Sequence, residues 1–153
     1  MPVKVVKKKT AKKEDVMGRF SVDVALTNNM DLMLAQAGHL PAEKVRRMTV
    51  RGVVDTGAAR LVIPKSVAVQ LGVKVTGKVG VRYADGRRAV RPVVDNVHVL
   101  LQGRASVFKA AVEVKRESAL IGAIVLEDLD FLVDTTQERL LPRDPKMIIS
   151  EEE

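Results

Sequence analysis

The stretch Val53-Val54-Asp55-Thr56-Gly57-Ala58-Ala59 places a single carboxylate on a glycine turn directly behind an apolar strand. Its two valines are β-branched, and such residues favour a pleated strand. Asp-Thr-Gly then ends the strand, because Asp and Thr hydrogen-bond to nearby backbone and Gly tolerates unusual dihedral angles. The sequence therefore predicts that a strand holds Asp55 rigidly, while Gly57 lets another backbone or a bound molecule come close.

The composition is that of one globular domain. A chain of 153 residues, 46% of them hydrophobic, is long and apolar enough to bury a core. Without Cys it has no disulfide framework and no thiol chemistry, which fits a reducing cytoplasm. No apolar run approaches the ~20 residues that span a bilayer, and no apolar segment follows the N-terminal lysines as in a secretory signal. We therefore expect a soluble, cytoplasmic protein with no membrane partner.

The net charge of +7 is concentrated at the N-terminus. Six lysines precede the first acidic residue: Lys4, Lys7, Lys8, Lys9, Lys12 and Lys13. Without these six, 20 basic residues face 19 acidic ones, so the rest of the chain is nearly neutral. We expect residues 1–15 to form a basic, disordered tail, and nucleic acid or an acidic partner would bind only through it. An aromatic content of 3% argues against a surface on which bases stack.

Alternating apolar and polar residues, with turn residues between the runs, predict a mostly-β chain. The predicted strands are 20–26, 45–54, a hairpin over 79–90, 93–101, 107–114, a closing hairpin of 131–134 with 139–141, and 147–149. Short helices are predicted at 28–38, capped by Asn28 or Asn29, at 64–71 and at 124–129. Asp85-Gly86 is expected to supply the positive φ angles of a type I′ turn in the first hairpin. These elements favour a β-barrel or sandwich with short helices.

Three features in a fixed order resemble the retropepsin-like aspartic proteases: VVDTGAA at 53–59, the hairpin that follows it, and the apolar-Gly element Leu120-Ile121-Gly122. Bacterial members of that family continue with a short helix and a closing hairpin, which residues 123–129 and 131–142 match. The resemblance covers roughly residues 17–145 and is to a bacterial, single-domain retropepsin-like (clan AA) protein. It implies a closed acid-protease β-barrel with one to three short helices, active as a twofold homodimer.

The resemblance also implies roles for individual residues. Asp55 is the expected catalytic residue, and the residues that support its loop are Thr56, whose hydroxyl bonds across the dimer axis, Gly57 and Ala58. The expected flap residues are Tyr83, Ala84, Asp85 and Gly86. Strand packing explains Tyr83 as well as catalysis does, and turn formation explains Asp85 and Gly86. No cofactor and no metal are expected, since two histidines without Cys are too few for a convincing metal site.

Peptide hydrolysis by an aspartic protease needs two carboxylates, and this chain has one Asp-Thr-Gly and no Asp-Ser-Gly. Two carboxylates about 3 Å apart share one proton. One then activates a water while the other protonates the carbonyl oxygen of the peptide. The second Asp55 must therefore come from another copy of the chain related by a twofold axis. Residues 16–146 are expected to form the protease domain, and 147–153 a C-terminal strand or tail at the dimer interface.

Two expectations concern the reaction conditions and the substrate. Ala58 stands where pepsin-like enzymes often have Ser or Thr, and without that hydroxyl the ionised dyad loses a hydrogen bond. We therefore expect a pH optimum nearer neutrality than that of a gastric protease. The residues expected to line a pocket for apolar peptide side chains are Val53, Ile63, Ala84, Val94 and Ile121.

Two other functions stay open at this point. A retropepsin-like fold does not guarantee activity, so a catalytically silent peptide-binding or dimerisation module is the main alternative to an aspartic endopeptidase. A nucleic-acid-associated protein dominated by its basic tail is the third. Substitution of Asp55 distinguishes the endopeptidase from the binding or dimerisation module, because only hydrolysis depends on the Asp55 carboxylate.

Overall fold

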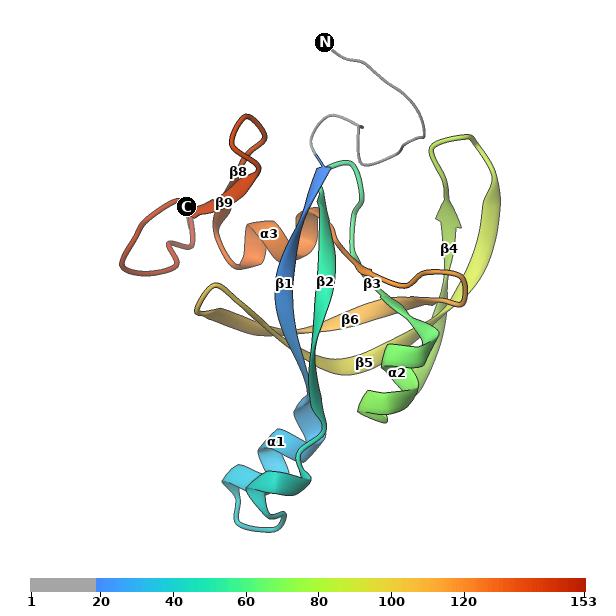
Figure 1. The fold of residues 1–153 in the computed structure, drawn as a ribbon, viewed down its shortest axis with the longest axis vertical. Coiled ribbons are helices and arrows are strands. Elements are labelled where there is room, and N and C mark those ends of the chain that lie inside the picture. Colours follow the sequence, from blue (N-terminus) through green and yellow to red (C-terminus); the bar gives the residue numbers. More distant parts are fainter. Residues whose placement is uncertain (1–18) are drawn as a thin grey trace.

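Residues 19–153 are described by a computed structural model of the chain, and their central feature is a closed β-barrel (Figure 1). Around the barrel the strands follow the order β1 (Arg19–Asn28), β2 (Arg47–Asp55), β7 (Ala119–Ile121), β3 (Leu61–Pro64), β6 (Arg104–Glu113) and β5 (Arg88–Leu101). Residues 25–28 of β1 pair with 97–100 of β5 and close the ring. This confirms the predicted mostly-β barrel. The expected basic tail, residues 1–15, lies outside the described residues.

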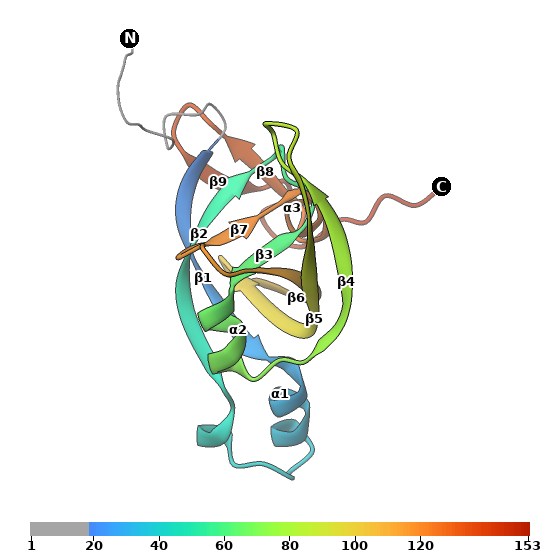
Figure 2. The same ribbon diagram turned by 90° about the vertical axis from the view of Figure 1, so that its right-hand side faces the viewer.

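Two further pairings lie outside the ring. The strand β4 (Val75–Arg82) pairs with the first half of β5, and β8 (Phe131–Asp134) pairs with β9 (Arg139–Pro142). Figure 2 shows the β4–β5 hairpin standing away from the barrel beside β3 and β7. Because only β5 holds β4 in the sheet, this hairpin can move relative to the barrel more easily than a strand that is paired on both sides.

Short helices flank the barrel: α1 (Asn29–Gln36), the 3₁₀ turn η2 (Ala42–Lys44), α2 (Lys65–Leu71) and α3 (Ala123–Asp128). All three predicted α-helices are confirmed. The side chain of Asn28 caps α1 by accepting a hydrogen bond of 3.0 Å from the amide of Asp31. At the C-terminus of α2, Gly72 adopts φ +69°, a left-handed conformation that glycine tolerates best.

The barrel core follows from strand alternation, since successive side chains point to opposite faces of a sheet. On β2, Val54 is fully buried inside the barrel, while Val53 and Asp55 point to the outer face and are partly exposed. The strands β3 and β7 follow the same rule. The other fully buried core side chains include Leu26, Leu61, Ile63, Val97, Val99, Leu101 and Ile121. Burial of such aliphatic side chains is the main stabilising contribution to the fold.

Two predictions about strands were wrong, and of the strand or tail predicted at the C-terminus the structure shows no strand. The strand β3 was missed, because it has only four residues and its partners β6 and β7 lie far along the chain. The predicted break before residue 93 is absent, and β5 runs through Pro92, where β4 is its only neighbour and a missing N–H costs least. Residues 147–149 form no strand in the single chain.

The tip of the β4–β5 hairpin also differs from the prediction. A type I′ turn needs two residues with positive φ, whereas here Gly86 has φ +89° and Asp85 does not have a positive φ. The amide of Gly86 donates to the carbonyl of Tyr83, and the amide of Tyr83 donates to the carbonyl of Arg87, each at 2.9 Å. The tip is therefore a three-residue loop that ends on a left-handed glycine.

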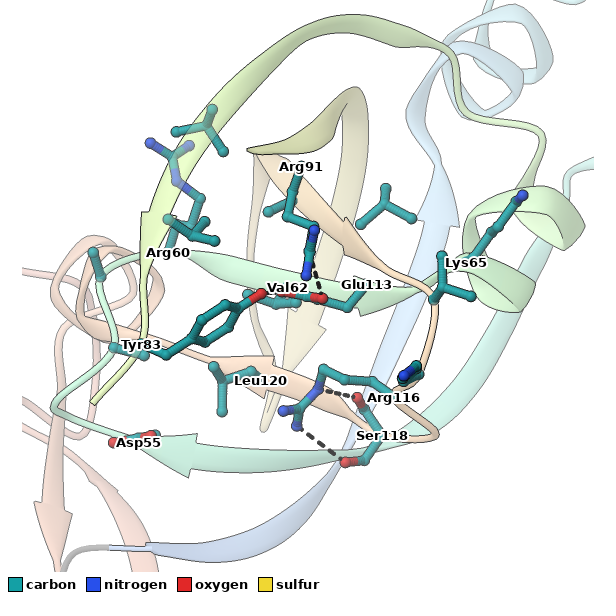
Figure 3. Close-up of a pocket in the computed structure, with 18 of the residues that line it drawn as sticks. Asp55, Arg60, Val62, Lys65, Tyr83, Arg91, Glu113, Arg116, Ser118 and Leu120 are labelled. Carbon is teal, nitrogen blue, oxygen red and sulfur yellow. Dashed lines mark hydrogen bonds and ion pairs between the residues drawn. The ribbon is translucent and has the colours of Figure 1, made fainter. Parts of the chain in front are cut away.

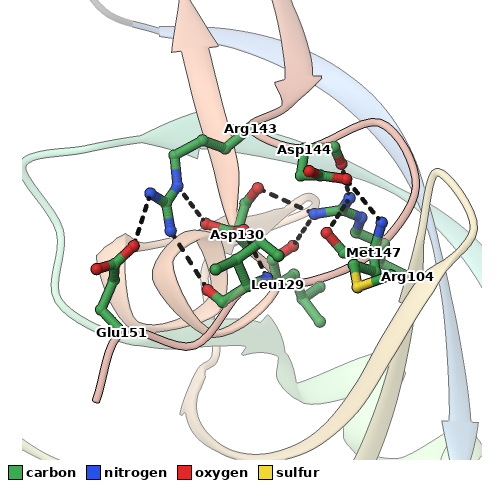
Figure 4. Close-up of polar contacts among 8 residues, drawn as sticks. Arg104, Leu129, Asp130, Arg143, Asp144, Met147 and Glu151 are labelled. Atoms are coloured by element: carbon green, nitrogen blue, oxygen red, sulfur yellow. Dashed lines mark hydrogen bonds and ion pairs between the residues drawn. The ribbon is translucent and has the colours of Figure 1, made fainter. Parts of the chain in front are cut away.

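The C-terminal segment is fastened to the barrel by polar contacts (Figure 4). The buried carboxylate of Asp130 accepts hydrogen bonds from the amide of Ile149 at 3.0 Å and from Arg143 at 2.7 Å. These two contacts, that of the Ile149 amide first, hold the pKa of Asp130 below its ordinary value. Arg104 donates to four carbonyl oxygens, those of Leu129, Asp130, Asp144 and Met147. Residues 143–149 are thereby positioned without forming a strand.

The helix α1 is held at the opposite end of the barrel from the hairpin tip by the buried carboxylate of Asp31 (Figure 1). Its two oxygens accept three hydrogen bonds from Arg46: 3.0 Å from the backbone amide, 2.8 Å from Nε and 3.0 Å from Nη2. The guanidinium of Arg46 is the main reason that the pKa of Asp31 lies below its ordinary value. Protonation of this carboxyl must therefore weaken the folded state.

Asp31→Asn should make the stability less sensitive to acid. A lowered folded pKa contributes stability that is complete above the unfolded pKa of about 3.9 and is lost as the pH falls through the folded pKa. Urea titrations at several pH values should show the wild type losing free energy of unfolding in this range, and the variant, already weakened at neutral pH, losing less. Asp23→Asn, in the exposed pair of Asp23 with Arg51, should behave like the wild type. Equal acid sensitivity of Asp31→Asn and the wild type would contradict the assignment.

Candidate active site

A cleft of about 1400 Å³ lies between the outer face of the barrel and the β4–β5 hairpin (Figure 3). Its floor consists of outward-pointing side chains from neighbouring strands. In the sheet register Leu120 of β7 lies between Val53 of β2 and Val62 of β3, and all three line the cleft. Asp55, two residues beyond Val53 on the same face, also lines it. The cleft floor is therefore apolar, with one carboxylate at the end of β2.

Asp55 is held by contacts to both of its carboxylate oxygens. Oδ1 accepts a hydrogen bond of 2.9 Å from the amide of Gly57, which closes the turn after β2. Oδ2 forms an ion pair of 2.9 Å with Nη2 of Arg19, which lies directly opposite Asp55 in the pairing of β1 with β2. The Asp55 side chain is 14% exposed. In the single chain, the carboxylate is therefore accessible but already paired with a cation.

The loop after Asp55 is held by backbone hydrogen bonds from the start of α3. The amides of Ala123 and Ile124 donate to the carbonyls of Ala58 and Ala59, both at 2.8 Å. This approach requires glycine at position 122, because a Cβ there would lie 2.7 Å from the Arg60 carbonyl oxygen and 2.8 Å from that of Ala58. The two segments that the sequence singled out, 55–58 and 120–122, are thus brought into direct contact.

The hairpin is tied to the barrel by Tyr83. Its hydroxyl donates to Oε2 of Glu113 on β6 at 2.6 Å, and Arg91 donates to Oε1 of the same carboxylate at 2.8 Å. The hydrogen bond to Glu113 is the main reason that the pKa of Tyr83 is raised. The guanidinium of Arg87 lies 4.7 Å from the centre of the Tyr83 ring. Tyr83 therefore anchors the hairpin beside the cleft, as Figure 3 shows.

Not every residue predicted for the site lies in the cleft. Ala58, Tyr83 and Ala84 line it with Asp55, Gly57 and Leu120. Thr56 is exposed on the turn and does not line the cleft. Asp85 bonds to its neighbour Arg87, and neither Asp85 nor Gly86 at the hairpin tip lines the cleft.

The predicted pocket lining was partly wrong. Val53, Ala84 and Val94 line the cleft, whereas Ile63 and Ile121 are fully buried inside the barrel. The reason is strand parity, because Ile63 and Ile121 alternate with Val62 and Leu120 and so face the core. The alternation of side chains along a strand is visible in the sequence. Which of its two faces lines the core and which lines the cleft is decided only when the barrel closes.

Several polar residues of the cleft were missed by sequence reasoning. Arg19 lies opposite Asp55, Arg91 and Glu113 hold Tyr83, and Arg116 lies in the loop between β6 and β7. No local motif marks these residues, since each is brought to the cleft by a strand pairing between distant parts of the chain. Within residues 19–153 no cluster of three or more His, Cys, Asp or Glu side chains could hold a metal ion.

A family model described as aspartyl protease matches residues 44–123, more than half of the chain, and includes both Asp55 and Leu120-Ile121-Gly122. This chain belongs to the aspartyl protease family. No curated protein matches its sequence. None of the helices in residues 19–153 has the length and hydropathy needed to cross a membrane.

One solved retroviral protease structure shares the fold of this aspartyl protease chain with a TM-score above 0.5. The structure of EIAV protease complexed with the inhibitor HBY-793 is similar with a TM-score of 0.52 and 17% sequence identity, over 81% of this chain and 94% of that chain. The solution structure of Simian Foamy Virus (mac) protease gives a TM-score of 0.41 and 13% identity, over 51% of this chain and 80% of that chain. At such identities the first likeness extends to the fold alone.

Gly122→Ala should destabilise the domain by roughly 2–3 kcal/mol, because the new Cβ would overlap backbone atoms that cannot rotate away. Gly80→Ala is the matched control, since a Cβ at Gly80 meets nothing within 4 Å and should change the free energy of unfolding by less than about 0.5 kcal/mol. Chemical denaturation measures both. Equal stabilities of the two variants would show that the loop and α3 do not need their close approach.

Tyr83→Phe should loosen the hairpin, because it removes the hydroxyl that binds Glu113. Amide hydrogen exchange near the hairpin tip should speed up about tenfold, as expected for the loss of one hydrogen bond to a charged group. The β1–β2 pairing in the same sample is the internal control and should exchange at the wild-type rate. Unchanged exchange at the tip would mean that Tyr83 does not anchor the hairpin.

Proposed function

We propose that this chain is an aspartic endopeptidase that acts as a twofold homodimer, with Asp55 of each copy forming the catalytic dyad. The observation that supports this most is the position of Asp55, whose carboxylate stands at the edge of the apolar cleft floor, on a loop braced by α3. The other two acidic residues of the cleft are Glu113, which binds Tyr83 and Arg91, and Glu117 on the β6–β7 loop. Only Asp55 is on the Asp-Thr-Gly turn.

In the proposed mechanism, the two Asp55 carboxylates share one proton across the axis. The ionised member removes a proton from a water as it attacks the peptide carbonyl, and the protonated member donates its proton to the carbonyl oxygen. The first carboxyl then gives its proton to the peptide nitrogen as the C–N bond breaks, while the second takes a proton from a hydroxyl of the tetrahedral diol, which restores the shared proton. The amide of Gly57 holds the Asp55 carboxylate in place, and the bonds from α3 stop the loop from moving during the reaction. Both contacts reduce the reorganisation needed at the moment of proton transfer.

In this proposal, the ion pair of Asp55 with Arg19 exists in the single chain and is broken when the dimer forms. Two carboxylates cannot approach to share a proton while a guanidinium stays between them. In this proposal, dimer assembly therefore moves Arg19 away from Oδ2 of Asp55. The same contact is the specific observation that favours the alternative function, a silent peptide-binding or dimerisation module in which Arg19 keeps Asp55 neutralised.

Substrate and dimer contacts complete the proposal. An extended peptide fits between the cleft floor and the β4–β5 hairpin, which acts as the flap, with apolar side chains against Val53, Val62 and Leu120. The C-terminal segment offers a contact to the second copy, because Met147, Ile148 and Ile149 are 59%, 41% and 38% exposed. Exposed apolar side chains on a positioned segment are suited to burial in an interface.

Mixing wild type with Asp55→Asn tests whether two Asp55 residues form one site. The variant should cleave no peptide, while keeping the fold, because an amide oxygen can still accept the Gly57 hydrogen bond. After subunit exchange at equal amounts and fixed total concentration, only about a quarter of random dimers hold two carboxylates. Activity should therefore fall to about a quarter of the wild-type value.

The control is a mixture of wild type with Asp23→Asn, an exposed residue that does not line the cleft, and it should keep full activity. A fall to one half in the Asp55→Asn mixture would mean that each chain acts alone. If purified wild type cleaves no peptide library at any pH, the binding module becomes the better description.

A further inference from the structure

The cleft is strongly basic, although the chain without its six N-terminal lysines carries 20 basic and 19 acidic residues. Eight of its lining residues are basic: Arg19, Arg60, Lys65, Arg82, Arg87, Arg91, Lys115 and Arg116. Three are acidic: Asp55, Glu113 and Glu117. A concave surface lined mostly by one sign of charge focuses its electric field and attracts ligands of the opposite sign. The ligand that fits this cleft therefore has negative charge.

Some of these cations already have partners. Arg19 pairs with Asp55, Arg91 with Glu113 and Arg87 with Asp85. Among the residues that the structure describes, the other five form no ion pair with a carboxylate. One of these five, Arg116, has its guanidinium held in place by hydrogen bonds.

Arg116 is half-buried and is fixed by neutral acceptors alone. Its Nε donates to the carbonyl of Ser118 at 2.9 Å, and its Nη2 donates to the Ser118 hydroxyl at 3.3 Å and to the carbonyl of Ala119 at 3.4 Å. Burial lowers the pKa of this guanidinium, although arginine stays charged in proteins. Partial burial of a cation that has no ion pair with a carboxylate costs free energy of solvation. A carboxylate of the ligand would offset that cost.

Arg116 also lies close enough to Asp55 to act on the same ligand. Its loop leads into β7, where Ala119 pairs with Gly52, three residues before Asp55 on β2. The Arg116 guanidinium bonds to the Ala119 carbonyl. From that point to Asp55 the separation along β2, at about 3.3 Å per residue, is roughly 10 Å, the length of about three residues of an extended peptide. Figure 3 shows Arg116 beside Leu120, on the floor of the cleft with Asp55.

A peptide fits this arrangement better than a nucleic acid does. Single-stranded nucleic acids bind in grooves where bases stack on aromatic rings. Among the described lining residues, Tyr83 has the one partly exposed aromatic ring, and the guanidinium groups of Arg87 and Arg91 lie 4.7 and 5.9 Å from its centre. The apolar floor next to Arg116 suits a chain that alternates apolar and acidic side chains.

We propose that Arg116 is a specificity residue that binds an Asp or Glu side chain of the substrate, within about three residues of the scissile bond. The inference rests on the proposed peptidase function and names its substrate class. The carboxylate would accept hydrogen bonds from the guanidinium edge that faces the cleft, as in bidentate arginine–carboxylate pairs. The apolar floor binds the neighbouring side chains.

Matched peptide pairs test this assignment. Each pair differs only by Asp against Asn, or Glu against Gln, at one of the positions flanking a cleaved bond. Wild type should cleave the acidic member with kcat/KM at least about tenfold higher at one such position. Arg116→Gln should bring that ratio close to one, Arg116→Lys should keep part of it, and Arg116→Glu should favour Lys at the same position. Arg47→Gln is the matched control, since Arg47 is exposed at the far end of β2 and should keep the wild-type ratio.

Binding to the Asp55→Asn protein provides a readout that does not need catalysis. Fluorescence anisotropy of the same peptides, labelled, should show tighter binding of the acidic member, and the added Arg116→Gln substitution should remove the difference.

If wild type cleaves both members equally, or if Arg116→Gln keeps the acidic preference, the assignment of Arg116 is wrong while the peptidase function stands. If wild type cleaves neither, the peptidase function fails and anisotropy alone decides on Arg116. Loss of oligonucleotide binding in Arg116→Gln, with peptide binding unchanged, would also overturn the assignment.

Discussion

Two hydrogen bonds hold the site together: those from the amides of Ala123 and Ile124 to the carbonyls of Ala58 and Ala59. They join the loop after β2 to the start of α3, two segments more than sixty residues apart in the chain. They form only because position 122 has no side chain, since a Cβ there would overlap the Ala58 and Arg60 carbonyl oxygens. The position of Asp55 depends on this contact, because a loop without it would be free to move the carboxylate.

The barrel contributes in a different way. Its interior is a closed apolar core, so the cleft is built on its outer face from side chains that alternate with the core ones. Val53, Val62 and Leu120 owe their place in the cleft to the same strands that bury Val54, Ile63 and Ile121. The site is therefore as rigid as the core beneath it, while the hairpin, which pairs with the sheet along one side and is anchored by Tyr83, is the part suited to open and close.

Local sequence signals predicted most of the elements. Asn28 as a cap, Gly72 as a helix terminator and the β-branched valines before Asp55 act over a few residues, so their effects are visible in the chain itself. The type I′ turn at Asp85-Gly86 was wrong because the same dipeptide also fits a three-residue loop. The four-residue strand β3 was missed because its partners are distant in sequence.

By itself the sequence determined a mostly-β fold and the Asp-Thr-Gly turn, because these depend on residue types and spacing along one chain. The closed barrel and the association of this turn with Leu120-Ile121-Gly122 followed from the resemblance to retropepsin-like proteases. The ion pair of Arg19 with Asp55, the anchoring of Tyr83 by Glu113 and the basic lining around Arg116 were decided by the tertiary structure alone. Each of these joins residues that only strand pairing brings together, and electrostatic interactions depend on distance in space rather than on distance in sequence. The Asp-Thr-Gly turn was visible in the sequence, whereas the charges around it are brought together only by the strand pairings of the closed barrel.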